Sequence, residues 1–235
     1  TTEIYTLSLH DALPILLPGE DVTCTFTNTA QPGTINIVKT VVGQVPPADW
    51  AFTGTLGEFG IDKAGGTKPF TGLAAGDYTV NETAKPGYTQ AVSCSSGESG
   101  VGSVTVSLQP GETVTCTFTN TAQPGTITVV KTVVGQVPAA AWQFTGSLGT
   151  FTLPAAGGTS TPFTGLAGGY LINETAKPGY TQAVACNTGE TGVGSVTVNL
   201  DPGEDVVCTF TNTAQPGTIN IVKTVVGQAP PADWA

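Results

Sequence analysis

The stretch "YTVNETAKPGY", Tyr78 to Tyr88, places an acid where an apolar side chain is expected. Successive side chains of a β-strand point to opposite faces, so Tyr78, Val80 and Glu82 share one face. The same pattern returns with Glu174 in a second copy of the stretch. A buried carboxylate is costly unless it is paired or protonated. The sequence therefore predicts that each acid has a partner inside a core.

An internal repeat organises the whole chain. Cys24, Cys116 and Cys208 recur at equal intervals of about 92 residues, the length of a small domain. Each copy runs from "PGTI" to "CTFTNTAQ", which predicts complete units at 33–124 and 125–216. By the same register, residues 16–32 correspond to the last strand of an upstream copy, and residues 217–235 to the first strand of a downstream copy.

Residues 1–15 fall outside this repeat. Their sequence, "TTEIYTLSLHDALPI", resembles the in-frame translation of a widely used short-read sequencing adapter, so we expect this segment to be non-native. The repeat register resumes at Leu16, which aligns with Leu108 and Leu200. We expect an incomplete reading frame, and the absence of a signal peptide or an anchor carries no weight.

Composition excludes several classes of function. The only histidine, His10, lies in the adapter-like segment, which argues against catalytic triads, histidine bases and most zinc sites. The formal net charge is −10 and the chain has no arginine, which argues against nucleic-acid binding. We expect no cofactor and no metal. Abundant threonine, glycine, valine and isoleucine favour an extracellular all-β protein.

Short alternating runs separated by glycine, proline and asparagine predict the strands of a β-sandwich. No segment has the helical period. In the first complete unit we expect strands at 34–42, 51–55, 67–73, 78–82, 88–94, 102–108 and 112–120. The linker "TAQPG" between units is short and contains proline, so the array should form a rod.

Two further strands end their inward stripes on a polar residue. Ile35 and Ile37 share a face with Lys39, and Phe118 shares a face with Asn120. A lysine, a glutamate and an asparagine are thus expected at one end of each core. The predicted sets are Lys39, Glu82 and Asn120 in the first unit and Lys131, Glu174 and Asn212 in the second.

This trio predicts a covalent bond. In an apolar setting the pKa of an amine falls and that of a carboxylic acid rises, so a neutral amine and a protonated acid can coexist. The amine can attack the asparagine side-chain carbonyl while the acid polarises it, releasing ammonia and leaving an amide. The alternative is that the lysine reaches solvent at a strand end, the glutamate forms a salt bridge with it, and the asparagine caps a turn.

Three motifs carry a family resemblance: "GTINIVK", "YTVNETAKPGY" and "CTFTNT". They resemble the first-strand lysine, the Tyr-x-x-x-Glu segment before Pro-Gly-Tyr and the last-strand asparagine of Cna B-type, SpaA-like prealbumin-fold (transthyretin-like) domains. The resemblance covers each complete unit and implies tandem Ig-like or prealbumin-like β-sandwich domains. It also implies Lys–Asn isopeptide bonds assisted by Glu82 and Glu174. That family builds the stalks of adhesins and pilins; paired cysteines depart from its best-known members.

The five cysteines fit one disulfide per complete unit. We expect Cys94 to pair with Cys116 and Cys186 with Cys208. A metal site is disfavoured because CxxC spacing and histidine are missing, and reactive thiols are disfavoured by the inward position of Cys116. Three residues of the incomplete copies, whose partners we expect outside the sequence, are Cys24, Asn28 and Lys223.

The expected function is a structural stalk or spacer of a bacterial cell-surface adhesin or pilin-like protein, located outside the cell or in the cell wall. The expected partners are neighbouring repeats, together with a host or cell-surface ligand of a tip domain absent here; we expect no nucleic acid and no membrane contact. Catalysis would be limited to single-turnover self-crosslinking. One alternative is a carbohydrate- or ligand-binding module that uses its loops and Trp50, although Trp50 shares strand parity with Phe52 and is better placed in the core. Another is an accessory module of a secreted enzyme.

Overall fold

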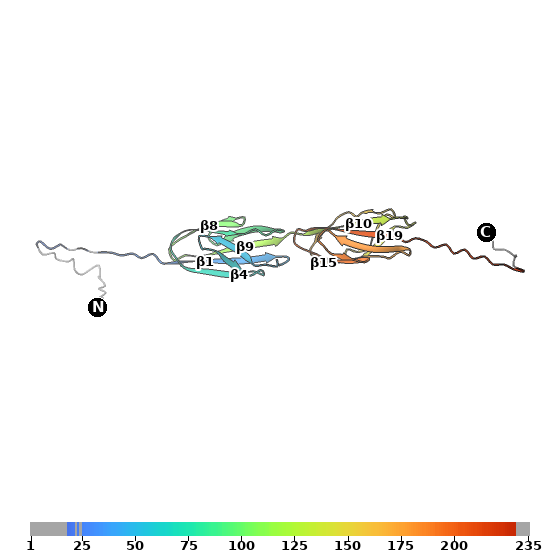
Figure 1. The fold of residues 1–235 in the computed structure, drawn as a ribbon. Helices are drawn as coiled ribbons and strands as arrows, with labels where there is room; N and C mark the ends of the chain where they lie inside the picture. The colour runs from blue at the N-terminus through green and yellow to red at the C-terminus, as the bar shows by residue number, and fades with distance from the viewer. Residues whose placement is uncertain (1–17, 22, 24, 229–235) are drawn as a thin grey trace.

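The computed structural model describes residues 18–21, 23 and 25–228. Two β-sandwich units lie end to end and form an elongated body (Figure 1). All of its regular elements are strands, as the sequence predicted. Within the described residues there is no helix with the length and apolar character needed to cross a membrane. The adapter-like residues 1–15 and Cys24 lie outside the described residues.

The first unit contains nine strands, and the seven expected strands coincide with seven of them to within a few residues. The alternation of buried and partly exposed side chains along the first strand shows why the chain is extended there. Two short strands, β3 and β7, were not predicted. The strands are β1 (Gly33–Val42), β2 (Trp50–Gly54), β3 (Phe59–Ile61), β4 (Gly66–Leu73), β5 (Gly76–Glu82), β6 (Tyr88–Cys94), β7 (Ser99–Gly100), β8 (Ser103–Leu108) and β9 (Thr113–Ala122).

These strands form two sheets that enclose one core. The five-stranded sheet has the order β4-β1-β9-β6-β7, and the four-stranded sheet has the order β3-β2-β5-β8. The first strand, β1, pairs in parallel with the last strand, β9. Because the two strands run in the same direction, the chain enters the unit at one end and leaves at the other. This topology makes the unit a segment of a rod.

The second unit repeats this architecture with one local change. Its sheets have the orders β13-β10-β19-β16-β17, with β14 also paired to β10, and β12-β11-β15-β18. The equivalent of β4 is split into β13 and β14 at the point where the second unit has one more residue than the first, "STPF" in place of "KPF". The strands are β10 (Gly125–Val134), β11 (Trp142–Gly146), β12 (Phe151–Leu153), β13 (Gly158–Thr159), β14 (Phe163–Leu166), β15 (Gly168–Glu174), β16 (Tyr180–Cys186), β17 (Thr191–Gly192), β18 (Ser195–Leu200) and β19 (Asp205–Ala214).

Aromatic side chains fill the centre of each core. Trp50 is completely buried, as its strand parity with Phe52 predicted, and the Phe52 ring packs edge-on against Phe118 with centroids 5.2 Å apart. Trp142, Phe144 and Phe210 repeat this packing in the second unit. These contacts join the two sheets, because Trp50 and Phe52 belong to one sheet and Phe118 to the other.

Backbone contacts fix the joint between the units. Gln123 of the linker donates its N–H to the Gly87 carbonyl of the first unit at 2.8 Å, and its own carbonyl accepts the N–H of Gly203 of the second unit at 2.9 Å. Gly87 has φ +76°, and a Cβ at this position would lie 1.8 Å from the Pro202 carbonyl oxygen. Only glycine therefore allows this close approach. The hydrogen bond from Gln215 N–H to the Gly179 carbonyl, also 2.8 Å, repeats one half of the joint.

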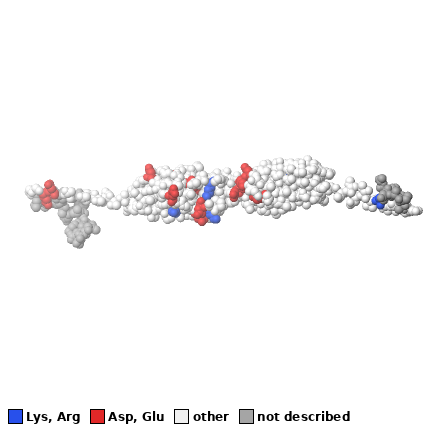
Figure 2. Space-filling model, in the orientation of Figure 1, with Lys and Arg blue, Asp and Glu red and all other residues white. Residues whose placement is uncertain are grey.

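The flanking segments extend away from the two units as thin tails (Figure 1). The described parts of 16–32 and 217–235 contain no strand, although the sequence predicted one in each. A strand needs a neighbour for its ladder hydrogen bonds, and the described residues of these two segments are not paired with any strand. Charged residues on the face shown in Figure 2 gather on the first unit and near the junction, whereas uncharged residues cover most of the second unit.

Candidate functional site

The structure brings the predicted trio together at one end of each core. Lys39 comes from β1 and Asn120 from β9 of one sheet, while Glu82 comes from β5 of the opposite sheet. All three residues are buried. The Lys39 Nζ lies 3.2 Å from Glu82 Oε1, an ion-pair distance, and neither side chain is exposed to solvent. The partner predicted for the buried acid is therefore Lys39.

Each lysine also donates hydrogen bonds to backbone carbonyls. Lys39 Nζ donates to the carbonyls of Thr40 and Phe118, both at 3.2 Å. In the second unit, Lys131 Nζ lies 3.3 Å from Glu174 Oε1 and donates to Thr132 and Phe210 at 3.0 Å. These contacts aim the amine at the last strand of its unit.

The two units differ at the asparagine. Lys131 Nζ donates to the side-chain Oδ1 of Asn212 at 2.8 Å, so the amine and the amide are in direct contact. In the first unit, among the described residues, neither Nδ2 nor Oδ1 of Asn120 has a hydrogen-bond partner, and the same is true of Asn212 Nδ2. A buried polar atom without a partner costs about 1–3 kcal/mol. Any reaction that removes the amide nitrogen would relieve this cost.

Burial changes the protonation equilibrium of each lysine, whose amine also lies over a tryptophan ring. Lys39 Nζ lies 4.2 Å from the centroid of the Trp50 ring, and Lys131 Nζ lies 4.4 Å from that of Trp142. Burial lowers the pKa of Lys39 and of Lys131, and the neighbouring Glu82 and Glu174 oppose this shift only in part. A lowered pKa increases the fraction of neutral amine, which is the nucleophilic form.

Sequence reasoning missed one member of the cluster. Gln90 in β6 donates its side-chain Nε2 to Glu82 Oε2 at 2.9 Å, and Gln182 donates to Glu174 Oε2 at the same distance. The signal that finds it is the strand alternation used for the trio, because Gln90 shares a face with Tyr88 and with the buried Val92. Of the residues assigned to the incomplete copies, Asn28 and Lys223 are exposed.

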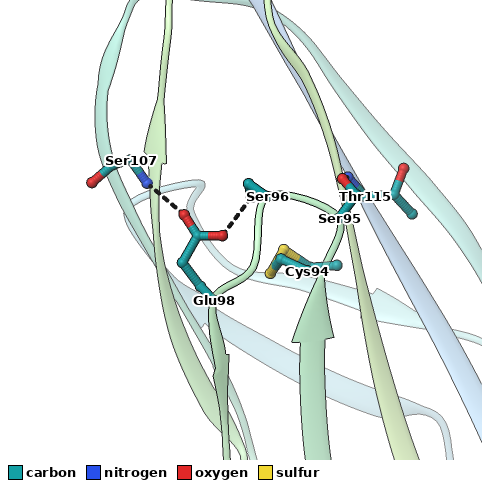
Figure 3. Close-up of a disulfide and its surroundings, with 7 residues drawn as sticks. Cys94, Ser95, Ser96, Glu98, Ser107 and Thr115 are labelled. Carbon is teal, nitrogen blue, oxygen red and sulfur yellow. Dashed lines mark hydrogen bonds between the residues drawn. A yellow bond between two sulfur atoms is a disulfide. The ribbon is translucent and has the colours of Figure 1, made fainter.

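A disulfide closes the other end of the β6–β9 pair in each unit. The predicted disulfides are present in the structure and join Cys94 to Cys116 and Cys186 to Cys208, each with a sequence separation of 22. Figure 3 shows the first one beside the turn that follows β6, where Glu98 accepts hydrogen bonds from the Ser96 hydroxyl and the Ser107 N–H. Hydrogen bonding from Ser96 lowers the pKa of Glu98. The disulfide and the buried trio thus lie along the same inward face of β9, which carries both Cys116 and Asn120.

The lowered lysine pKa predicts a pH dependence in a chain that cannot cross-link. In an Asn120→Ala, Asn212→Ala variant both lysines remain amines, with folded pKa values below the unfolded value of 10.5. Between the folded and the unfolded pKa, the unfolded state binds more protons than the folded state. The free energy of unfolding should therefore rise as the pH increases towards 10.5, and this stability should be lost as the pH falls through the folded pKa of the lysines. Urea denaturation between about pH 7 and pH 10 would measure this slope.

The matched control for this slope is a Lys39→Ala, Lys131→Ala variant, which lacks both amines. Its stability should change less with pH over the same interval, since tyrosines and exposed lysines are common to both chains. Equal slopes in the two variants would contradict the assignment of the pH dependence to the buried lysines.

Comparison with known proteins identifies the family to which these units belong. Residues 35–122 and 122–210 match two SpaA family models, each described as a prealbumin-like fold domain. No curated protein matches the chain. Similar solved structures include the Bacillus anthracis TIE protein, with 17% identity and a TM-score of 0.45 over 78% of this chain and 34% of that one. The chain thus spans about a third of the TIE protein.

Two other similar structures are a pilin and an adhesin. The Streptococcus pyogenes major pilin T-13 has 14% identity and a TM-score of 0.34, over 80% of this chain and 100% of that one. An adhesin from Mobiluncus mulieris containing intramolecular disulfide, isopeptide and ester bond cross-links has 12% identity and a TM-score of 0.35, over 79% and 100%. The two family matches together cover most of the sequence, and the chain therefore belongs to the SpaA family of prealbumin-like fold domains, which it contains twice in tandem.

Proposed function

We propose that this chain is a stalk segment of a bacterial cell-surface adhesin or pilin-like protein, and that a Lys–Asn isopeptide bond closes each of its units. The bonds would join Lys39 to Asn120 and Lys131 to Asn212. Glu82 and Glu174 would carry the proton. The protein would have no catalytic turnover, because each site would react once with residues of its own chain.

One observation carries the chemical part of this proposal: Lys131 Nζ lies 2.8 Å from Asn212 Oδ1, while Glu174 Oε1 lies 3.3 Å from the same nitrogen. Nucleophile, acceptor and acid are thus held together before any reaction. Such fixed geometry replaces a bimolecular encounter with an intramolecular one, which can lower the barrier by several kcal/mol. Burial excludes the water that would compete for the carbonyl.

The reaction balances within the trio. Neutral Lys131 Nζ attacks Asn212 Cγ, and protonated Glu174 polarises the amide oxygen. A proton from Nζ passes through Glu174 to the departing Nδ2, which leaves as ammonia. One C–N bond forms and one breaks, and no oxidant, metal or cofactor takes part. The product is an uncharged amide, which suits its apolar surroundings better than an ion pair does.

The stalk part of the proposal is supported by the topology and the joint. The parallel pairing of β1 with β9 sends the chain from one end of a unit to the other. The contacts of Gln123 with Gly87 and Gly203 limit bending between units. A row of such units would hold a distal part of the protein away from the cell. The match to SpaA prealbumin-like domains supports this location outside the cell, because that family builds the stalks of adhesins and pilins.

Neighbouring repeats of the same protein are the proposed partners. Residues 217–226 repeat the sequence of β1, yet Ile219 and Ile221 are 89% and 91% exposed, whereas the equivalent Ile35 and Ile37 are 0% exposed. Apolar side chains at these strand positions need a covering partner. The other strands of a downstream unit would supply it, as β9 and the opposite sheet of the first unit do for β1.

The carbohydrate-binding alternative depended on an accessible tryptophan. Trp50 is 0% exposed, and its ring faces the Lys39 amine inside the core. It is therefore unavailable as a stacking platform for a sugar, and no other observation favours this function over the stalk.

Mass spectrometry tests the proposal directly. The full chain, folded and then reduced to remove the mass change due to disulfides, should be lighter than its sequence mass by two ammonias, about 17 Da for each bond. A Glu82→Gln variant keeps the size of the side chain but cannot exchange the proton, so it should lose only one ammonia. Peptide mapping should locate the remaining branch at Lys131. An unshifted mass in folded protein would refute the isopeptide bonds.

A further inference from the structure

We propose that Gln90 and Gln182 are positioning residues for isopeptide formation, each holding the glutamate of its unit so that one carboxylate oxygen faces the lysine. This inference rests on the proposed function and adds a residue to its machinery. Its starting point is the hydrogen bond from Gln90 Nε2 to Glu82 Oε2 at 2.9 Å, which recurs between Gln182 and Glu174 at 2.9 Å. Because both units contain this hydrogen bond, we treat it as part of the architecture of the site.

The position of Gln90 in the fold connects the acid to the strand that carries the acceptor. Gln90 in β6 lies directly opposite Asn120 in β9 in the antiparallel register, and Gln182 lies opposite Asn212 in the same way. Glu82 belongs to the other sheet. The Gln90 side chain thus spans the sandwich and fixes the acid relative to the asparagine strand.

The two oxygens of each glutamate consequently have different partners. Glu82 Oε2 accepts from the Gln90 amide, while Oε1 lies 3.2 Å from Lys39 Nζ. An amide NH₂ group donates hydrogen bonds and does not accept protons under ordinary conditions. The proton that moves from lysine to the leaving ammonia must therefore travel through Oε1. Without Gln90 the carboxyl group could rotate, and neither oxygen would be held at the amine.

A glycine fixes the glutamine in turn. Gly102 has φ +66°, and a Cβ there would lie 2.7 Å from Gln90 Oε1, so the amide packs directly on this backbone. The Gly102 carbonyl also accepts the N–H of Glu82 at 2.7 Å. Gly194 makes the same two contacts with Gln182 and Glu174. One glycine thus holds both the acid and the residue that orients it.

The test measures the rate of bond formation with the second unit as an internal reference. The full chain carrying Gln90→Leu is isolated unfolded and without cross-links from inclusion bodies, diluted out of denaturant, and quenched in acid at intervals. Peptide mapping then quantifies each branched peptide. We expect the first unit to form its bond on the order of 10–100-fold more slowly than the second, because the acid is misplaced. The ratio of the two rates in the unmodified chain is the baseline for this change, because the units differ in the contact between lysine and asparagine.

A conservative variant separates positioning from packing. Glu at position 90 has nearly the size of glutamine but donates a hydrogen bond only while the pair of carboxyl groups holds a proton. In Gln90→Glu, the rate of the first unit relative to the second should therefore fall as the pH rises. A residue that only fills space would give the same ratio at each pH.

A second measurement controls for folding. Tryptophan fluorescence does not distinguish the two units. Folding of the first unit is therefore followed at each time point, under reducing conditions, by the protection of the Cys94 and Cys116 thiols from alkylation. The proposal is overturned if the ratio of the two rates in Gln90→Leu equals that in the unmodified chain, or if the delay of the first unit matches a delay in this protection. If neither unit of the unmodified chain released ammonia, the isopeptide bonds themselves would be refuted, and the positioning role with them.

Discussion

Pulling the full chain by its two ends under reducing conditions is expected to leave both units without a full-length unfolding step. Lys39 lies on the first strand and Asn120 on the last, and the chain enters and leaves each unit at opposite ends (Figure 1). Tension from the linkers therefore reaches these two strands first. The proposed bond would carry the force between them, and the chain enclosed between lysine and asparagine would remain folded.

The expected size of this effect follows from the length of the enclosed chain. Lys131 and Asn212 are separated by 81 residues, which would extend by about 270 Å at ~3.3–3.4 Å per residue. Single-molecule force spectroscopy of a Lys39→Ala, Lys131→Ala variant should show two such steps, while the unmodified chain shows none. Full-length steps in the unmodified chain would remove the mechanical basis of the proposed stalk.

The second large effect is on equilibrium stability. Closing a loop of this length should stabilise a unit by about 4–5 kcal/mol in the chain-entropy model used for disulfides. An Asn120→Ala variant should lose this contribution and the packing of the amide, but it retains the Lys39–Glu82 pair. Chemical denaturation of reduced protein, followed for the first unit by protection of its cysteines, would measure the loss.

The matched variant Lys39→Ala should be less stable still. It removes the cross-link and also leaves Glu82 buried without its cation, and removing one partner of a buried pair typically costs about 3–5 kcal/mol. The difference between the two variants therefore separates the covalent contribution from the electrostatic one. Stabilities equal to that of the unmodified chain in both variants would contradict a cross-link in the first unit.

Strand alternation was sufficient to predict most of the fold. Threonine alternates with apolar residues in "CTFTNT", and this pattern places Cys116, Phe118 and Asn120 on one face without reference to any neighbour. The strands that were missed, β3 and β7, have only three and two residues. So short a segment shows no period, and its pairing depends on the longer strand beside it.

The same alternation applies to the site. It placed Lys39, Glu82 and Asn120 inside the core, where the structure has them. It could also have found Gln90, which interrupts the inward stripe of β6. The buried Trp50 was correctly predicted as a core residue, whereas its contact with the Lys39 amine depends on how the two sheets face each other.

The sequence by itself determined which side chains turn inward, because that depends only on the two-residue period of a strand. The tertiary structure decided which of them meet. The parallel register pairs Val41 with Asn120, which brings together residues from the two ends of a unit, and the stacking of the sheets adds Glu82 from the opposite side. It also decided that Gly87 of one unit contacts Pro202 of the next. Such contacts depend on the path of the whole chain, since residues far apart in sequence become neighbours only when the sheets and the joint have formed.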